Sequence, residues 1–144
     1  MLRNKIDAED ILQESFIKAF KNLGSFRSDS PFGPWLKRIV INGCIDFLKK
    51  RKLIFADDEM EIADVADVEN EKMDIDPGII HEAIKELPDG ARVIFNLFIL
   101  ENYKHKEIAD MLNISESTSK SQYQRARIML QEKLKAHAYE ELDR

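Results

Sequence analysis

An acidic segment near the middle of the chain limits what the sequence can fold into. The run "ADDEMEIADVADVENEKMDIDP" (56–77) has no glycine and no sustained apolar stripe, and residues 53–90 carry 2 Lys or Arg against 13 Asp or Glu. Such a segment buries too little apolar surface to offset the entropy lost on ordering it. We therefore expect a flexible acidic linker over residues 53–76, with a small folded module on each side.

The flanking segments predict helices. Hydrophobic residues make up 44% and charged residues 34% of the 144 residues, with only 5 Gly and 4 Pro, and no run alternates like a strand. Residues 1–52 carry 11 Lys or Arg against 6 Asp or Glu, whereas residues 91–144 carry 9 against 8. Charge segregation on this scale suggests separate modules. We expect an all-α chain of two small helical domains, residues 1–52 and 77–144.

The sequence favours a cytoplasmic protein. No apolar run is long enough to cross a membrane, and the N-terminus lacks a signal-peptide pattern. A single cysteine, Cys44, excludes an internal disulfide and suits a reducing compartment. We interpret Cys44 as a small buried apolar group.

Catalytic and metal-binding patterns are missing from the sequence. His81, His105 and His137 lie far apart, without ligand-like spacing to each other or to Cys44. No glycine loop could hold a phosphate, and carboxylates in a mobile linker cannot keep the geometry of acid–base catalysis. We therefore predict that the protein is not an enzyme and has no metal or cofactor.

The first helix is predicted from a cap and an apolar stripe. Asp7 is a preferred N-cap residue, followed by further acidic residues that favour a helix start. Spacings of three and four residues build an apolar stripe from Leu12, Phe16, Ala19, Phe20 and Leu23. We expect this stripe to face the core and Gly24 to close the helix. The opposite stripe holds Asp10, Gln13, Glu14 and Ile17, and the apolar Ile17 at its centre hints at a partner surface.

A second helix is predicted over residues 34–52, after the loop sequence "SFRSDSPFGP". One face carries the apolar set Trp35, Leu36, Ile39, Val40, Gly43 and Phe47. Ile41, Ile45 and Leu48 lie well round the helix from it, so the helix needs neighbours on most sides. The remaining polar stripe is Arg38, Asn42 and Lys49.

The C-terminal half has the spacing of a helix-turn-helix. Asp76 followed by Pro77 predicts a helix start, and "ARVIFNLFIL" (91–100) predicts a buried helix. After "HKEIADML" (105–112), Asn113 can adopt the left-handed turn conformation and Ile114 can fill the angle between helices. Ala109 permits their close approach, and Ser115 can cap a final helix from about residue 116 into the 130s.

The final helix has an inward face and an outer face of different composition. Ser119, Tyr123, Ala126 and Leu130 recur at steps of four, three and four, so they are predicted to pack inward. The outer face collects hydroxyls, amides and cations, namely Ser117, Thr118, Lys120, Ser121, Gln124, Arg125 and Arg127. No acidic residue lies between Ser117 and Gln131. Such side chains can bind phosphates and base edges in a major groove, so we predict DNA contact.

Two motifs resemble a known family. The segment "HKEIADMLNISESTSKSQYQRARIML" closely resembles the promoter-reading C-terminal domain of bacterial extracytoplasmic-function (ECF) RNA polymerase sigma factors. The segment "DAEDILQESFIKAFKNLGSFRSDSPFGPWLKRIVINGCIDFLKKRK" is similar to the second conserved region of the same family. The resemblance implies a transcription initiation factor whose partners are core RNA polymerase, promoter DNA and, in some members, an anti-sigma factor.

The resemblance also implies roles for individual residues. Polymerase binding falls on Asp10, Gln13 and Glu14. Reading of the minus-ten element falls on Arg38, Asn42 and Lys49 with the loop Ser25 to Gly33, while Trp35 is structural. Reading of the minus-thirty-five element falls on the outer-face residues Ser117, Thr118, Lys120, Ser121, Gln124, Arg125 and Arg127.

The sequence departs from the family pattern in a few places. Members usually begin earlier, with a further N-terminal helix packed against the core of this second region. We therefore expect Ile41, Ile45 and Leu48 to be partly uncovered and the chain to self-associate. Ser119 replaces a usual apolar residue on the inward face, and Ser117 a common glycine.

Two alternatives remain at this stage. One is a helix-turn-helix regulator that acts without polymerase and dimerises on paired half-sites. The other is a truncated decoy that occupies polymerase without opening DNA. Co-elution with core polymerase distinguishes the first of these from a sigma factor, and transcription in vitro distinguishes the second.

Overall fold

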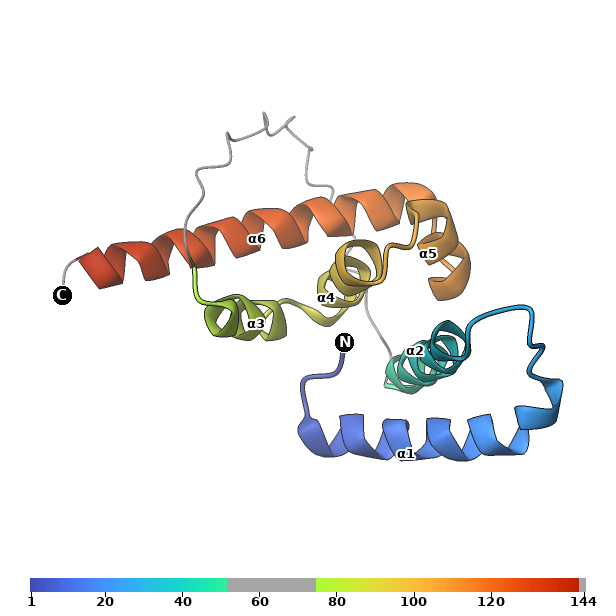
Figure 1. Cartoon of the computed structure of the whole chain (residues 1–144). Helices are drawn as coiled ribbons and strands as arrows, with labels where there is room; N and C mark the ends of the chain where they lie inside the picture. Colours follow the sequence, from blue (N-terminus) through green and yellow to red (C-terminus); the bar gives the residue numbers. More distant parts are fainter. Residues whose placement is uncertain (52–74, 143–144) are drawn as a thin grey trace. The chain divides into compact units, whose positions relative to one another are not determined.

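The computed structural model describes residues 1–51 and 75–142, and every regular element in these ranges is helical. The chain divides into two compact units, Met1–Leu53 and Ile54–Arg144, whose helices are drawn in Figure 1. The prediction of an all-α fold is confirmed. The predicted linker lies outside the described residues, apart from its last two positions.

The N-terminal unit is a helical hairpin. It consists of α1 (Lys5–Lys21), the short 3-10 helix η1 (Leu23–Ser25) and α2 (Phe32–Lys50). Asp7 does not cap α1, because the preceding Asn4 side chain already accepts hydrogen bonds from the N–H groups of Ile6 (2.8 Å) and Asp7 (3.4 Å). The Asp7 carboxylate instead lies 3.3 Å from the Arg51 guanidinium, which ties the start of α1 to the end of α2.

The buried face of α1 differs from the predicted stripe. Ile11, Ser15 and Ala19 are buried, whereas Leu12, Phe16, Phe20 and Leu23 are 44%, 42%, 73% and 49% exposed. The prediction placed only apolar residues on the buried face and left Ser15 out. The Ser15 hydroxyl donates to the Ile11 carbonyl at 2.6 Å, and a polar group satisfied by its own helix can be buried at little cost. Gly24 also does not end α1, which stops at Lys21 with Asn22 as its cap.

Gly43 brings α1 and α2 close together. A Cβ atom at this position would lie 3.1 Å from Ser15 Oγ and 3.3 Å from Ile11 Cγ2, closer than side chains usually pack. The glycine on α2 therefore faces the small serine on α1, and neither residue carries apolar bulk. This is why a search for large apolar residues did not find the contact.

Ile41, Ile45 and Leu48 are only 5%, 3% and 6% exposed. They lie on the side of α2 opposite Gly43, the residue that meets α1, so packing against α1 does not account for their cover. An uncovered patch on the N-terminal unit therefore stays a prediction. Among the described residues of this unit, most of the large exposed apolar side chains belong to α1, where Ile6 and Ile17 are also exposed, at 68% and 54%.

The C-terminal unit is built along one long helix. Its elements are α3 (Pro77–Lys85), α4 (Asp89–Phe95), the π-helix η2 (Asn96–Leu100), α5 (His105–Leu112) and α6 (Glu116–Leu142). Figure 1 shows α3, α4 and α5 along α6, and each of them contacts it. The core where they meet contains Ala83, Leu87, Ala91, Ala126 and Leu130. None of the helices within residues 1–51 and 75–142 is long and apolar enough to cross a membrane.

Two polar features fix α3. Asp76 caps it as predicted, since its carboxylate accepts from the Gly78 N–H at 2.9 Å. Arg92 of α4 is 2% exposed and donates to the Leu87 carbonyl at 2.7 Å and to Asp89 at 2.5 Å. A buried charge is tolerated when its hydrogen bonds are made. Arg92 thus joins the end of α3 to the start of α4.

A groove runs between α3 and the far part of α6. It encloses about 570 Å³, and its walls include Ile79 and Ala83 of α3 and Leu134 of α6. Glu86 and Lys133 also line it and form an ion pair. The groove lies well along α6 from the helix-turn-helix.

We predict that Gly43→Ala destabilises the N-terminal unit by about 1–2 kcal/mol, because overpacking between two fixed neighbours outweighs the gain in helix propensity. Urea denaturation followed by the fluorescence of Trp35, the single tryptophan, reports on this unit. Gly33→Ala is the matched control, since nothing lies within 4 Å of a Cβ there. It should be neutral or stabilising, and Ser15→Ala should partly rescue Gly43→Ala. Equal stability of Gly43→Ala and wild type would contradict the close contact.

Candidate nucleic-acid interface

The turn between α5 and α6 has the predicted geometry. Asn113 adopts the left-handed conformation, with φ 55° and ψ 48°. Its N–H and the N–H of Ile114 both donate to the Ala109 carbonyl, the second at 3.0 Å, and Ala109 is 6% exposed. A non-glycine residue with positive φ is uncommon, and asparagine tolerates it best. The turn therefore directs α6 away from α5 at a fixed angle.

Ser115 starts α6 as predicted. Its hydroxyl accepts from the Thr118 N–H at 3.0 Å and lies 2.8 Å from the Thr118 hydroxyl. The Ser121 hydroxyl donates to the Thr118 carbonyl at 3.0 Å. The hydroxyls of Thr118 and Ser121, both on the outer face, therefore make hydrogen bonds within the start of α6, and these bonds fix their orientation.

The inward face of α6 is confirmed and gains one residue. Ser119 and Ala126 are fully buried, and Leu130 is 7% exposed. Tyr123 is half-buried, and its ring centroid lies 4.6 Å from that of Phe98. Gln122, at 5% exposure, was not predicted to be inside. Its position falls close to the inward arc of the helix, but the predicted stripe did not include it.

Ser119 has a partner across the helix-turn-helix. Its hydroxyl lies 2.9 Å from Nδ1 of His105, the first residue of α5. The His105 ring stacks on Phe98 with centroids 4.3 Å apart. Burial lowers the pKa of His105 below its usual value of 6.5, and the nearby Lys120 ammonium lowers it further. The serine that replaces a usual apolar residue is therefore a link between α5 and α6.

The outer face of α6 carries the predicted DNA-reading set. Ser117 and Lys120 are exposed, and the others are half-exposed, namely Thr118, Ser121, Gln124, Arg125 and Arg127. The Arg127 guanidinium lies 6.0 Å from the centre of the Tyr123 ring. The structure thus brings these side chains together on one side of one helix.

Glu116 was missed as a member of this surface. Its carboxylate lies 3.0 Å from the Lys120 ammonium, and this hydrogen bond and charge hold the pKa of Glu116 below its usual value. The acid-free stretch of the sequence starts at Ser117, directly after Glu116. The spacing of four between an acidic and a basic residue on a helix was the available signal.

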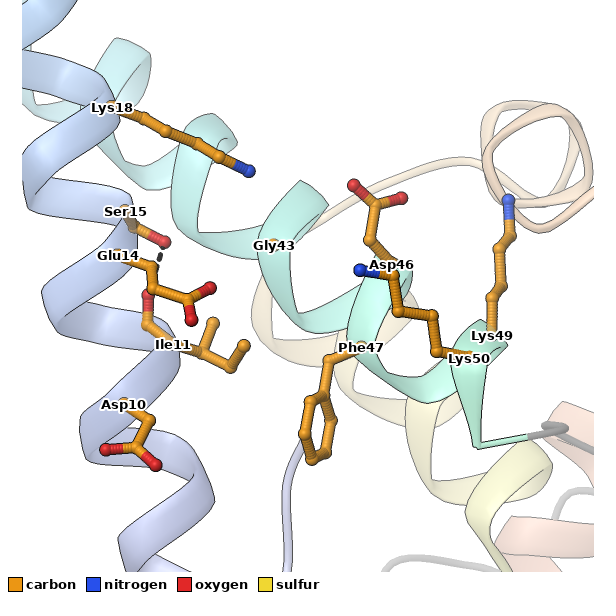
Figure 2. Close-up of a pocket in the computed structure, with 10 residues that line it drawn as sticks. All are labelled: Asp10, Ile11, Glu14, Ser15, Lys18, Gly43, Asp46, Phe47, Lys49 and Lys50. Carbon is orange, nitrogen blue, oxygen red and sulfur yellow. Dashed lines mark hydrogen bonds between the residues drawn. The ribbon is translucent and has the colours of Figure 1, made fainter.

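The two predicted sites of the N-terminal unit lie on separate helices. Asp10, Gln13 and Glu14 are exposed on α1, and Arg38, Asn42 and Lys49 form an exposed stripe on α2. Figure 2 shows Asp10 and Glu14 at a pocket of about 480 Å³ between the helices, with Lys18 beside them. The α2 side of the pocket includes Asp46, Lys49 and Lys50. Gln13 is not part of its lining.

An aromatic cluster joins the loop to α2. The ring centroids of Phe26 and Phe32 lie 5.1 Å and 5.5 Å from that of Trp35, and 5.6 Å from each other. Trp35 is half-buried, while Phe32 is 47% exposed. The tryptophan holds the loop against the start of α2, in keeping with the structural role expected for it.

The other chemistry of the described residues is limited. No three His, Cys, Asp or Glu side chains within residues 1–51 and 75–142 are grouped so that they could hold a metal ion. Cys44 is half-buried, and burial raises the pKa of its thiol. A raised pKa disfavours the reactive thiolate.

Comparisons with known proteins match both units. The family description "Sigma-70 region 2" matches residues 1–54, and "Sigma-70, region 4" matches residues 78–130. The ECF RNA polymerase sigma-E factor of Haemophilus influenzae is 31% identical, with 89% of this chain and 75% of the relative covered. The ECF RNA polymerase sigma factor SigW of Bacillus subtilis is 32% identical, with 94% and 79% covered.

Two further comparisons define the extent of the match. The ECF RNA polymerase sigma factor SigM of Mycobacterium tuberculosis is 33% identical over 89% of this chain, which spans 64% of that relative's length. Among solved structures, the sigma factor RpoE of Bartonella quintana, in complex with the anti-sigma factor NepR, has a TM-score of 0.56 and 27% identity. That match covers 88% of this chain and 80% of the other.

We predict that the C-terminal unit loses stability below about pH 6.5, the usual histidine value. Because folding lowers the pKa of His105, its contribution to the free energy of unfolding is fully present above the unfolded-state pKa. It is lost as the pH falls from that value through the lowered folded-state pKa. Urea denaturation followed by far-UV circular dichroism at several pH values measures this.

The variant His105→Asn keeps a polar atom near the Nδ1 position but does not titrate. It should show a weaker loss of stability in acid than wild type. Titration of the His105 ring by NMR in the folded protein, with a midpoint at or above the usual value, would contradict the prediction.

Proposed function

Because the chain belongs to the extracytoplasmic-function family of RNA polymerase sigma factors, we propose that it binds core RNA polymerase and directs it to promoters, where it initiates DNA-templated transcription. The observation that carries this proposal is the α5–α6 helix-turn-helix with its cationic, hydroxyl-rich outer face. The protein acts as an initiation factor without chemistry of its own, in the cytoplasm where the polymerase works.

The C-terminal unit reads the minus-thirty-five element through α6. The cap at Ser115 and the turn at Asn113 fix the start of α6, and the first turns of such a helix are the part that enters a major groove. Ser121 and Gln124 are short enough to approach base edges, while Lys120 and Arg125 reach further. Arg125 has the fork of donors that matches the two acceptors of guanine.

The N-terminal unit captures the minus-ten element. Arg38, Asn42 and Lys49 form one exposed stripe on α2, where two cations meet phosphates and the amide meets a base edge. The aromatic cluster holds the neighbouring loop in place. Exposed Phe32 offers a ring face, and stacking on aromatic rings is how single-stranded bases are commonly held.

The N-terminal unit also binds the polymerase through α1. Asp10, Gln13 and Glu14 are all exposed, and no packing within the unit requires their polar side chains. An anti-sigma factor is a further proposed partner, since the structural neighbour of Bartonella quintana was solved with one.

We predict that Arg125→Ala weakens promoter binding by about 1–3 kcal/mol and relaxes the preference at one base pair. Lys120→Ala should weaken binding on every sequence and lower the salt slope by about one, as the loss of one phosphate contact does. The measurement is promoter affinity of the reconstituted holoenzyme across salt concentrations and minus-thirty-five variants.

The matched control is Lys135→Ala, an exposed cation further along α6. It should leave both affinity and salt slope unchanged. Wild-type behaviour of both Lys120→Ala and Arg125→Ala on all promoters would mean that α6 is not the reader.

We predict that the double variant Gln13→Ala, Glu14→Ala binds core polymerase more weakly but melts like wild type, because substitutions of exposed residues change stability little. Co-elution with core polymerase and a thermal melt give the two readings. Glu132→Ala, an exposed carboxylate on α6, serves as the control. A large loss of melting temperature with intact polymerase binding would assign these residues to the fold instead.

A further inference from the structure

Three ionisable side chains meet where α5 and α6 begin. Glu116 and Lys120 of α6 are joined by a 3.0 Å ion pair, with their side chains 49% and 59% exposed. His105 of α5 lies beside this pair, because its Nδ1 is 2.9 Å from the hydroxyl of Ser119, which precedes Lys120 on α6 and lies one turn after Glu116. Both charges act on the pKa of His105. We call these three residues the charge cluster.

The His105 ring is held in place. Ser119 contacts its Nδ1 at 2.9 Å, and Phe98 stacks on its face. The centroid of the Tyr123 ring lies 5.6 Å from that of the His105 ring. Among the described residues, the charged groups of α6 that act on the ring are Glu116 and Lys120, while η2 contributes Phe98.

The Ser119 hydroxyl can donate to a neutral ring or accept from a protonated one. The ring can therefore gain a proton without losing this bond. His105 is thus free to change charge while keeping its position between the two helices.

We infer that DNA binding exchanges the cationic partner of Glu116: Lys120 leaves for a backbone phosphate, and His105, protonated from solvent, takes its place. This inference rests on the proposed function, in which α6 enters the major groove. It assigns to Glu116 a role in setting the affinity of the reading helix, and it makes promoter binding depend on a proton.

Each change on binding favours the proton on His105. Departure of Lys120 removes the ammonium that repels a charged imidazole. It also leaves the Glu116 carboxylate without its ion-pair partner, next to DNA phosphates that repel it. An approaching phosphate adds further negative potential. Lys106 of α5 is a second cation that acts on Glu116, whereas the His105 ring can add a new positive charge to the cluster.

Glu116 also limits affinity. In the free protein, Glu116 binds the Lys120 ammonium, which must be released before it can bind a phosphate. The free energy of an exposed ion pair of this kind is small. Once Lys120 has moved, the carboxylate remains at the DNA surface. Removing its charge should therefore strengthen binding most at high pH, where His105 cannot compensate for it.

The test is promoter affinity of the reconstituted holoenzyme between about pH 6 and pH 8, the range in which histidine titrates. Uptake of one proton makes the association constant of wild type rise by up to about tenfold per unit fall in pH. His105→Asn should abolish this slope. Glu116→Gln should tighten binding roughly twofold to fivefold near pH 8, the size of an exposed ion pair, and should flatten the slope.

His137→Asn is the matched control, because His137 is exposed on α6 outside the cluster. It should keep the full wild-type slope. A slope for His105→Asn equal to that of wild type, or weaker binding by Glu116→Gln, would overturn the inference.

The outcomes separate this inference from the proposed function. If Lys120→Ala and Arg125→Ala bind promoters like wild type, the reading role of α6 fails and the exchange fails with it. If both weaken binding while His105→Asn and Glu116→Gln leave the pH slope unchanged, the reader is correct and the exchange alone is wrong. Thermal melts near pH 8 test for unfolding. Glu116→Gln should melt like wild type, whereas His105→Asn loses the ring that stacks on Phe98, so its binding is measured well below its own melting midpoint.

Discussion

The left-handed turn at Asn113 is the constraint on which the C-terminal unit depends. With φ at 55°, this one residue sends α6 off at the angle that lets its inward face meet both α5 and the core residues of α3 and α4. The two hydrogen bonds to the Ala109 carbonyl hold the turn, and the small Ala109 side chain leaves room for it. If the turn were extended, Ser119 could not reach His105, and the outer face would no longer be presented as one surface.

The parts of this unit that could be predicted from sequence are those set by local rules. An asparagine between two helical patterns, a serine after it and apolar residues at helical spacing each act within a few positions of themselves. The turn, the cap and the inward stripe through Ala126 and Leu130 were therefore predicted correctly. The predicted reading residues of α6 do lie on one face, because periodicity alone places them.

The N-terminal unit shows where such reasoning stops. The face of α1 that packs is chosen by a serine bonded to its own helix and a glycine on the other helix, so the apolar pattern pointed to the wrong side. Asn4 and Asp7 are both preferred N-cap residues, and their residue types alone do not show which of them caps α1. Gln122 and Arg92 are buried because their polar groups find partners, which depends on tertiary structure. For Glu116, the signal was present but was not used.

The length of α6 sets a distance within the protein. At about 1.5 Å per residue, the 13 positions from Lys120 to Lys133 separate the reading surface from the α3 groove by about 20 Å. A continuous helix keeps that spacing far better than a loop would. A molecule held in the groove would therefore sit about two nanometres from the proposed DNA face. Because α3, α4 and α5 all pack on α6, a change in the tilt of α6 at the groove would alter its packing at the other end.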